Sequence, residues 1–197
     1  MNFILVFLIG LLLWLGRVVL TQEGMYFFLL WNLLLAFVPM KLSESLARRS
    51  PLDWRTWVVL SFWLLFFPNA PYIITDFIHL RSDGMMRWYD LILIMHFALS
   101  GMICAFLSLG QVHDWVMLYF GKREADSVLV VTVVASGLGV YIGRFQRWNS
   151  WDIFLHPLQI IQDSIQVLLY GNAFVFVLCF SGFLLANYLF FRKVMER

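Results

Sequence analysis

The sequence predicts an all-α, polytopic helical membrane protein that forms a single domain over residues 1–197, with about six transmembrane helices. Hydrophobic residues make up 62% of the chain, charged residues only 13%, and the mean hydropathy is +0.82. Soluble domains have about 45–50% apolar and about 25% charged residues. The formal net charge is only +2 and the basic residues are scattered, so the composition gives no support for nucleic acid as a partner.

The first two hydrophobic segments are predicted to form an antiparallel helical hairpin. Phe3–Leu20 resembles a secretory signal, but it has no basic start and no small-residue cleavage site, so we expect a retained span. Met25–Met40 is shorter and contains Asn32. The short turn Thr21–Gly24 joins the two segments.

The third segment, Trp57–Leu80, is predicted to be a broken helix because it contains Pro68 and Pro71. Each proline removes a backbone donor and biases the residue before it away from the helix. Either the helix breaks at Pro68 and resumes toward Leu80, or it is an ordinary proline kink. Asn69 is placed to bond a carbonyl that the break frees.

The remaining chain predicts three more spans and one interfacial helix. The spans are Leu91–Gly110, Ser127–Gly143 and Asn172–Phe191. Before the last span, Trp148–Tyr170 is too polar to cross a bilayer and too apolar for a free loop, and Pro157 suits the first turn of a helix there. A row of small residues in the fifth span predicts close helix packing. These residues are Ala135, Gly139 and Gly143.

The distribution of lysine and arginine predicts that both termini are cytoplasmic. With this orientation nine of the 14 basic residues lie on the inner face, near residues 41–55, 122–123 and 192–197. The other five, Arg17, Arg81, Arg87, Arg144 and Arg147, lie on the outer face. Two polar strings, 68–81 and 143–152, are therefore expected to meet at the outer face.

Acidic and histidine side chains in these strings are candidates for catalysis or metal binding. Asp76 and His79 are three residues apart and share a helical face, and Asp152 lies four residues before His156. Carboxylates and imidazoles serve as acids and bases and also bind zinc. The alternative is that they are helix caps or interface residues, so Asp76, His79 and Asp152 are candidates only. These residues do not define a metal site, and the sequence does not indicate a cofactor.

Arginine and asparagine residues in the same strings form a candidate anion site, because guanidinium groups bind phosphate through paired hydrogen bonds. The phosphate would belong to a lipid headgroup or a lipid-linked envelope intermediate. The alternative is that the arginines pair with Asp76, Asp90 or Asp152 and tie the two strings together. The candidate residues are Arg144, Arg147, Arg81, Asn69 and Asn149.

Two functional classes follow from these residues. The first is a membrane protein that binds or modifies a lipid-phosphate group. The second is a small transporter or an accessory or structural subunit, in which Asp76 and His96 line a polar path; a neutral His96 bonded to a neighbouring helix is the alternative. The sequence does not decide whether the protein is an enzyme. The expected partners are membrane lipids, a second copy of the chain or another membrane protein.

The two polar strings resemble a bacterial integral membrane family known as domain of unknown function 1361. The resemblance rests on Pro68–Tyr72, Thr75–Leu80, Trp88–Asp90 and Tyr141–Asp152, whereas the first two spans match only in hydrophobicity. It implies a location in the bacterial cytoplasmic membrane and makes these residues the site candidates. It implies no particular activity.

Overall fold

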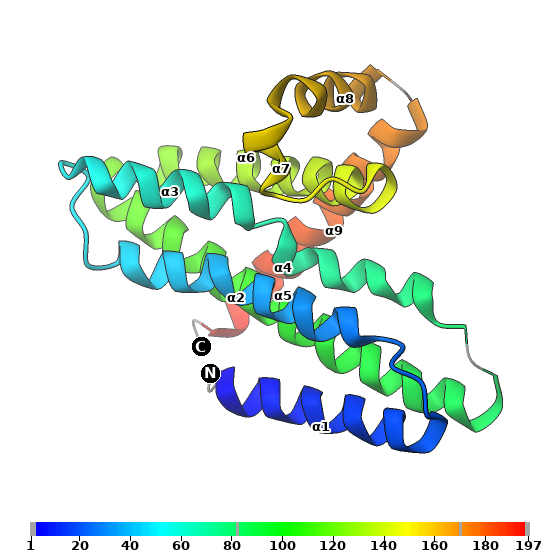
Figure 1. The fold of residues 1–197 in the computed structure, drawn as a ribbon. Helices are drawn as coiled ribbons and strands as arrows, with labels where there is room; N and C mark the ends of the chain where they lie inside the picture. The colour runs from blue at the N-terminus through cyan, green and yellow to red at the C-terminus, as the bar shows by residue number, and fades with distance from the viewer. Residues whose placement is uncertain (1–2, 82, 170, 196–197) are drawn as a thin grey trace.

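The computed structural model describes residues 3–81, 83–169 and 171–195, which form an all-helical bundle with no strand in those ranges (Figure 1). Six helical stretches in the described chain are long and apolar enough to cross a membrane, which confirms the predicted fold class. In chain order the elements are α1 (Phe3–Thr21), α2 (Phe27–Leu46), α3 (Trp54–Phe66), α4 (Asn69–Tyr72), the 3₁₀ helix η1 (Ile73–His79), α5 (Gly84–Phe120), α6 (Lys122–Tyr141), the π-helical turn η2 (Ile142–Gln146), α7 (Asp152–Leu155), α8 (Pro157–Leu169) and α9 (Gly171–Met195).

Helix α5 is the central helix, and it packs against α1, α2, α4, η1, α6 and α9. Its 37 residues extend about 55 Å at 1.5 Å per residue, beyond a hydrocarbon core of about 30 Å. The predicted span Leu91–Gly110 was too short at both ends, because helix continues through polar residues whose partners lie on other helices. One such residue is Asp90, which is fully buried.

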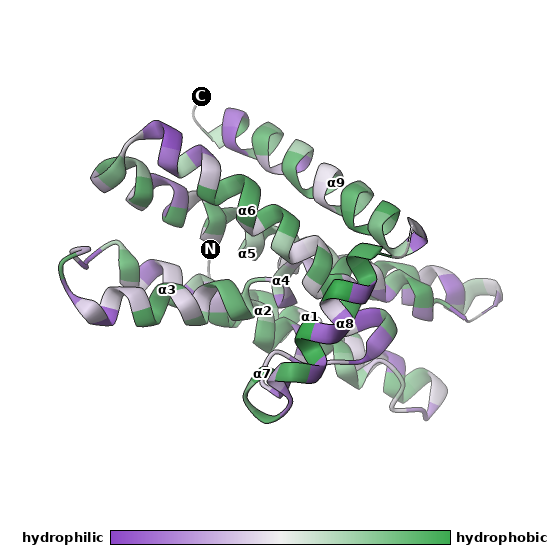
Figure 2. Ribbon diagram, turned by 90° about the horizontal axis from the view of Figure 1, so that it is seen from above, coloured by the Kyte–Doolittle hydropathy of each residue, from purple (hydrophilic) through white to green (hydrophobic). Residues whose placement is uncertain are grey.

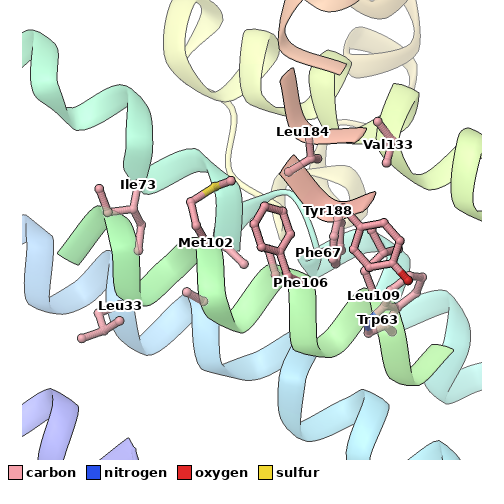
Figure 3. Close-up of a cluster of buried hydrophobic side chains, with 14 of the residues drawn as sticks. Leu33, Trp63, Phe67, Ile73, Met102, Phe106, Leu109, Val133, Leu184 and Tyr188 are labelled. Carbon is pink, nitrogen blue, oxygen red and sulfur yellow. The ribbon is translucent and has the colours of Figure 1, made fainter. Parts of the chain in front are cut away.

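The hydrophobic core surrounds the middle of α5 (Figure 3). Side chains of Met102, Phe106 and Leu109 on α5 lie in one cluster with residues of α2, α3, η1, α6 and α9. Apolar side chains fill the bundle on this level, so the centre of the molecule is a packed core. The other labelled members of the cluster are Leu33, Trp63, Phe67, Ile73, Val133, Leu184 and Tyr188.

The third segment is broken rather than kinked, and it resumes as two short helical pieces. Helix α3 ends at Phe66, and the chain steps through α4 into η1, which continues beside α5 (Figure 1). Pro68 keeps right-handed helical angles, φ −58° and ψ −24°. The backbone at Pro68 therefore stays in the helical region although the regular helix ends before it. The Asn69 side-chain nitrogen donates to the carbonyl oxygen of Phe66 at 2.9 Å, which confirms its predicted role at the break.

Small residues allow this broken segment to lie directly against α5 and α6. A Cβ on Gly101 of α5 would lie 2.6 Å from the carbonyl oxygen of Ala70. A Cβ on Gly139 would lie 2.9 Å from Pro68, and one on Gly143 would lie 3.3 Å from the Tyr72 ring. The predicted role of the small-residue row as a packing face is confirmed at Gly139 and Gly143, whereas Ala135 lines a cavity.

We expect Gly101→Ala to lower the free energy of unfolding by about 1–3 kcal/mol, because the added methyl group would meet backbone that cannot move independently. The matched control is Gly182→Ala in α9, where a Cβ would meet nothing within 4 Å. That substitution should raise stability by about 0.5–1 kcal/mol through helix propensity. Denaturant titration in detergent micelles measures both, and equal effects at the two glycines would contradict the close contact.

Polar contacts help to hold helix α1 to α5, beside the packing of partly buried side chains such as Phe7 and Leu11 against the core. Its only buried residues among those described are Gly10 and Arg17. The Tyr89 hydroxyl donates to the carbonyl oxygen of Leu13 at 2.7 Å, and the His96 Nε2 atom lies 3.1 Å from the carbonyl oxygen of Val6. His96 is thus bonded to a neighbouring helix, as one of the two predictions for it required.

The interfacial segment forms α7 and α8, and Pro157 is the first residue of α8 as predicted. Within α8 only Val167 is buried, and Figure 2 shows apolar and polar residues alternating along this helix. Leu158, Ile161 and Ile165 remain exposed on it. The position of α8 at a membrane interface stays a prediction.

Candidate functional site

A buried ion pair joins the two polar strings. The Arg144 guanidinium, on η2, donates through Nη2 to the Oδ1 atom of Asp76 on η1. Asp76 is fully buried. Its second carboxylate oxygen accepts a hydrogen bond from the side-chain nitrogen of Asn32 on α2 at 2.9 Å. Both oxygens of Asp76 therefore have protein partners, and the pair links three elements of the bundle.

Arg144 uses the rest of its guanidinium on neighbouring η1 and α4 side chains. Its Nε and Nη2 atoms donate to the Thr75 hydroxyl at 2.9 and 2.6 Å, and the guanidinium carbon lies 4.2 Å from the centre of the Tyr72 ring. The alternative in which Arg144 ties the strings together is thus the arrangement in the structure. Arg144 would have to leave these partners before it held an external anion.

His79 is a further partner of Arg144. The Nη1 atom lies 3.0 Å from His79 Nε2, and because a guanidinium has donors only, Nε2 must be the acceptor. The backbone of His79 is fixed as well, since its carbonyl oxygen accepts from the buried Tyr26 hydroxyl at 3.0 Å. A role for Nε2 as a base or metal ligand would require the loss of its bond to Arg144.

The local helix types explain why these side chains meet. Side chains three residues apart eclipse one another in a 3₁₀ helix, so Asp76 and His79 on η1 lie on one face, as the spacing predicted. The wider π turn η2 ends α6 and carries Arg144. Single π-helical turns occur frequently at functional sites.

Asp152 is not part of this cluster. Its Oδ2 atom accepts from the backbone nitrogen of Asn149 at 2.7 Å and from the Asn149 side chain at 3.1 Å, which is a local turn contact. His156 is exposed, with its ring 5.8 Å from the Trp148 ring. In the described ranges no three His, Cys, Asp or Glu residues come together to hold a metal ion, so the four-residue zinc arrangement considered from the sequence is not formed.

Two other predicted residues lie apart from the ion pair. Asp90, offered as a partner for the loop arginines, pairs instead with Arg17 on α1, with 2.7 Å between Nε and Oδ1. Arg81, a candidate for anion binding, is exposed at the end of η1. Arg81 does not line the cavity that lies beside the ion pair.

A cavity of about 460 Å³ lies beside the ion pair, between α2, the α3–α4 break, α6 and the 147–153 segment. Typical small-molecule sites have volumes of about 300–1,000 Å³. Its lining is mostly apolar, with asparagine, serine and arginine side chains at one part of the wall. The lining residues are Trp31, Asn32, Leu35, Leu64, Leu65, Pro68, Asn69, Tyr72, Ala135, Leu138, Gly139, Ile142, Gly143, Arg147, Trp148, Asn149, Ser150, Ile153 and Ile160.

Arg147 is the charged residue of this lining within the described chain. It is exposed, and its side chain has no hydrogen-bond or ion-pair partner among the described residues. Its backbone is left-handed, with φ 63° and ψ 29°, a conformation that costs a non-glycine residue roughly 1–2 kcal/mol. Glycine is the usual residue at such a helix end.

Sequence reasoning missed Asn32 as a site residue, and it included Tyr72 and Ser150 only through the family resemblance, without a role for either. Asn32 was treated only as a weakness of the second span, although a polar side chain inside a span is itself a signal for a buried contact. Ser150 accepts a hydrogen bond from Asn69 at 2.9 Å, a contact between residues 81 positions apart that no sequence spacing reveals.

Comparison with known proteins identifies a family but no activity. No curated protein and no solved structure matches the chain. The model of a family described as protein of unknown function (DUF1361) matches residues 31–186, which includes the cavity and the Arg144–Asp76 pair and leaves out α1. With six stretches that can cross a membrane, the chain is a multi-span membrane protein that belongs to the DUF1361 family.

Proposed function

We propose that the protein binds a membrane lipid with a phosphate-containing headgroup in the cavity, at the outer face of a bacterial cytoplasmic membrane. The observation that carries the proposal is Arg147, a cation without a partner among the described residues on the wall of a mostly apolar cavity. Its strained backbone adds support, because such strain is often retained where a side chain is needed for function.

The walls of the cavity fit an acyl chain. Leu35, Leu64, Leu138 and Ile142 supply apolar surface from three different parts of the bundle, and Ile160 adds surface from α8. Burial of apolar surface contributes about 25 cal/mol per Å². A molecule with a hydrocarbon chain can therefore use this surface, whereas a free inorganic anion can use only the polar part.

The polar part of the wall fits a phosphate group. A guanidinium offers paired donors that match phosphate oxygens, and the Ser150 hydroxyl keeps its proton for donation because it acts as the acceptor toward Asn69. Ser150 follows Arg147 by three residues in the same segment. The two donors are thus presented together.

The Arg144–Asp76 pair has a positioning role in this proposal. It fixes η2 to η1, and η2 leads directly into Arg147. The hydrogen bond from Trp148 Nε1 to Asp163 Oδ2, 2.7 Å long, fixes the following residue to α8. The backbone at Arg147 is therefore fixed from both sides, while its side chain has no partner in the described part of the chain.

Binding fits the geometry better than chemical modification or transport. Asp76 and His79 use the atoms that would act as base or metal ligand on Arg144 and Asn32. His96 contacts α1 and does not line the cavity. Around His96 on α5, the side chains of Leu93, Ile94 and Phe97 are buried and apolar. They do not provide the polar path that transport past His96 would need.

We expect Arg147→Gln to weaken binding of anionic lipid by about tenfold or more, because a hydrogen bond to a charged group contributes about 1.5–3 kcal/mol. Arg147→Gly should lose the lipid equally while the protein becomes more stable, since glycine relieves the left-handed strain. Native mass spectrometry of protein released from anionic-lipid nanodiscs measures the retained lipid, and thermal unfolding measures the stability.

The matched control is Arg81→Gln, which removes an exposed arginine from the other polar string and outside the cavity lining. It should leave the lipid retained. Equal loss in the Arg81 and Arg147 variants would indicate general attraction to a charged surface, and no loss in the Arg147 variants would contradict the proposed function.

A further inference from the structure

Two amide oxygens in the cavity wall indicate more about the ligand than its charge. The side-chain nitrogen of Asn32 donates to the Asp76 carboxylate, and the side-chain nitrogen of Asn69 donates to the Phe66 carbonyl oxygen. Both partners are acceptors, so the nitrogen of each amide must face them and the oxygen of each amide must face the other way. Both asparagines line the cavity.

Neither amide oxygen has a donor among the described residues. No described residue donates a hydrogen bond to either oxygen. Neither oxygen is among the fully buried side-chain atoms that lack a partner, so each has some exposed surface. The two oxygens are therefore accessible acceptors in the wall of a cavity. A ligand that desolvates them without offering a donor would bind at a cost of about 1–3 kcal/mol for each group.

A phosphate diester has no proton to donate, so phosphate alone leaves these acceptors unsatisfied. The matching donor is either a hydroxyl or an ammonium group. Arg147 is the only charged residue of the lining in the described chain, and no carboxylate is present there to balance an ammonium. The lining therefore favours a ligand with net negative charge and neutral donors.

From this arrangement we infer that the ligand is an anionic phospholipid whose headgroup alcohol carries free hydroxyl groups, which donate to Asn32 and Asn69 while the phosphate contacts Arg147. The inference rests on the proposed function and specifies its ligand class. Tyr72, Trp31 and Trp148 supply aromatic surface beside these polar groups, and that surface can pack against the carbon skeleton of the headgroup.

The test compares three lipids with identical acyl chains in nanodiscs, with retention measured by native mass spectrometry. Phosphatidylglycerol carries the phosphate and two hydroxyls, phosphatidic acid carries the phosphate without a headgroup alcohol, and phosphatidylethanolamine carries an ammonium. The wild-type protein should prefer phosphatidylglycerol over phosphatidic acid by about three- to tenfold, the effect of one or two neutral hydrogen bonds. Phosphatidylethanolamine should be retained least.

The variant Asn69→Leu should lower the ratio of phosphatidylglycerol to phosphatidic acid retained. The ratio is the measured quantity, because Asn69 also donates to Ser150 and its loss affects phosphate contacts for both lipids. Its matched control is Asn187→Leu in α9, because Asn187 is exposed, lies outside the cavity lining and donates to the Phe183 carbonyl oxygen at 2.8 Å in the same way. The control corrects for the lost backbone contact and should keep the full preference.

The outcomes separate this inference from the proposed function. Equal or stronger retention of phosphatidic acid, or the strongest retention of phosphatidylethanolamine, overturns the hydroxyl inference and leaves Arg147-dependent binding intact. An unchanged preference in Asn69→Leu also overturns it. Retention that does not depend on Arg147 with any of the three lipids overturns both.

Discussion

Replacement of Asp76 with alanine is expected to lower the free energy of unfolding by about 3–5 kcal/mol, the range typical for a buried ion pair that loses one partner. The variant would leave the Arg144 guanidinium buried without its carboxylate, and the Asn32 amide would lose its acceptor. The effect should be visible as a lower midpoint of denaturant unfolding in detergent micelles.

Two comparison variants make this expectation specific. The double variant Asp76→Leu with Arg144→Met should recover much of the loss, because apolar residues of similar size often replace a buried pair at little cost. Glu44→Gln, which removes the acid of the exposed Lys41–Glu44 pair, should change stability by less than about 1 kcal/mol. A mild effect of Asp76→Ala would contradict a structural role for the pair.

The second large effect is expected at Arg17, whose substitution with methionine removes the ion-pair partner of the buried Asp90 carboxylate. We expect a loss of about 3–5 kcal/mol here as well. Arg17 is 3% and Asp90 0% exposed, and the pair joins α1 to α5. Because Arg17 and Gly10 are the fully buried residues of α1 among those described, the variant should also loosen the attachment of this helix to the bundle.

Limited proteolysis and the unfolding midpoint measure this expectation together. Arg17→Met should be cleaved faster near the turn that follows α1 at Thr21. Arg49→Gln serves as the control, since the Arg49–Asp53 pair is partly exposed, with 3.7 Å between its atoms. If α1 stays as protected as in the wild type, the helix is held by its lipid-facing and backbone contacts instead.

Features with a local physical cause could be predicted from the sequence. Hydrophobic segments of spanning length predicted the six membrane helices, and Pro68 predicted the break in the third one. The bond from Asn69 to the freed carbonyl and the start of α8 at Pro157 follow from the same local chemistry. In each case the residue and its consequence lie within a few positions of each other.

Features that depend on tertiary contacts could not be predicted in this way. The sequence offered Arg144 and Arg147 as equal candidates, but only Arg144 is close enough to Asp76 to pair with it. Arg17 and Asp90 pair although they are 73 positions apart. This pairing places Asp90 inside the bundle and explains why α5 begins before Leu91, the predicted start of the span. The accessible oxygens of Asn32 and Asn69 depend on which acceptors fold against them.

The most direct test of the lipid site is an experimental structure of the protein in a bilayer that contains phosphatidylglycerol. Phosphate density should lie within hydrogen-bond distance of the Arg147 guanidinium, with the headgroup hydroxyls toward Asn32 and Asn69 and with Arg144 still paired to Asp76. A headgroup bound by Arg144 with Asp76 displaced, or a cavity that holds only solvent, would contradict the assignment.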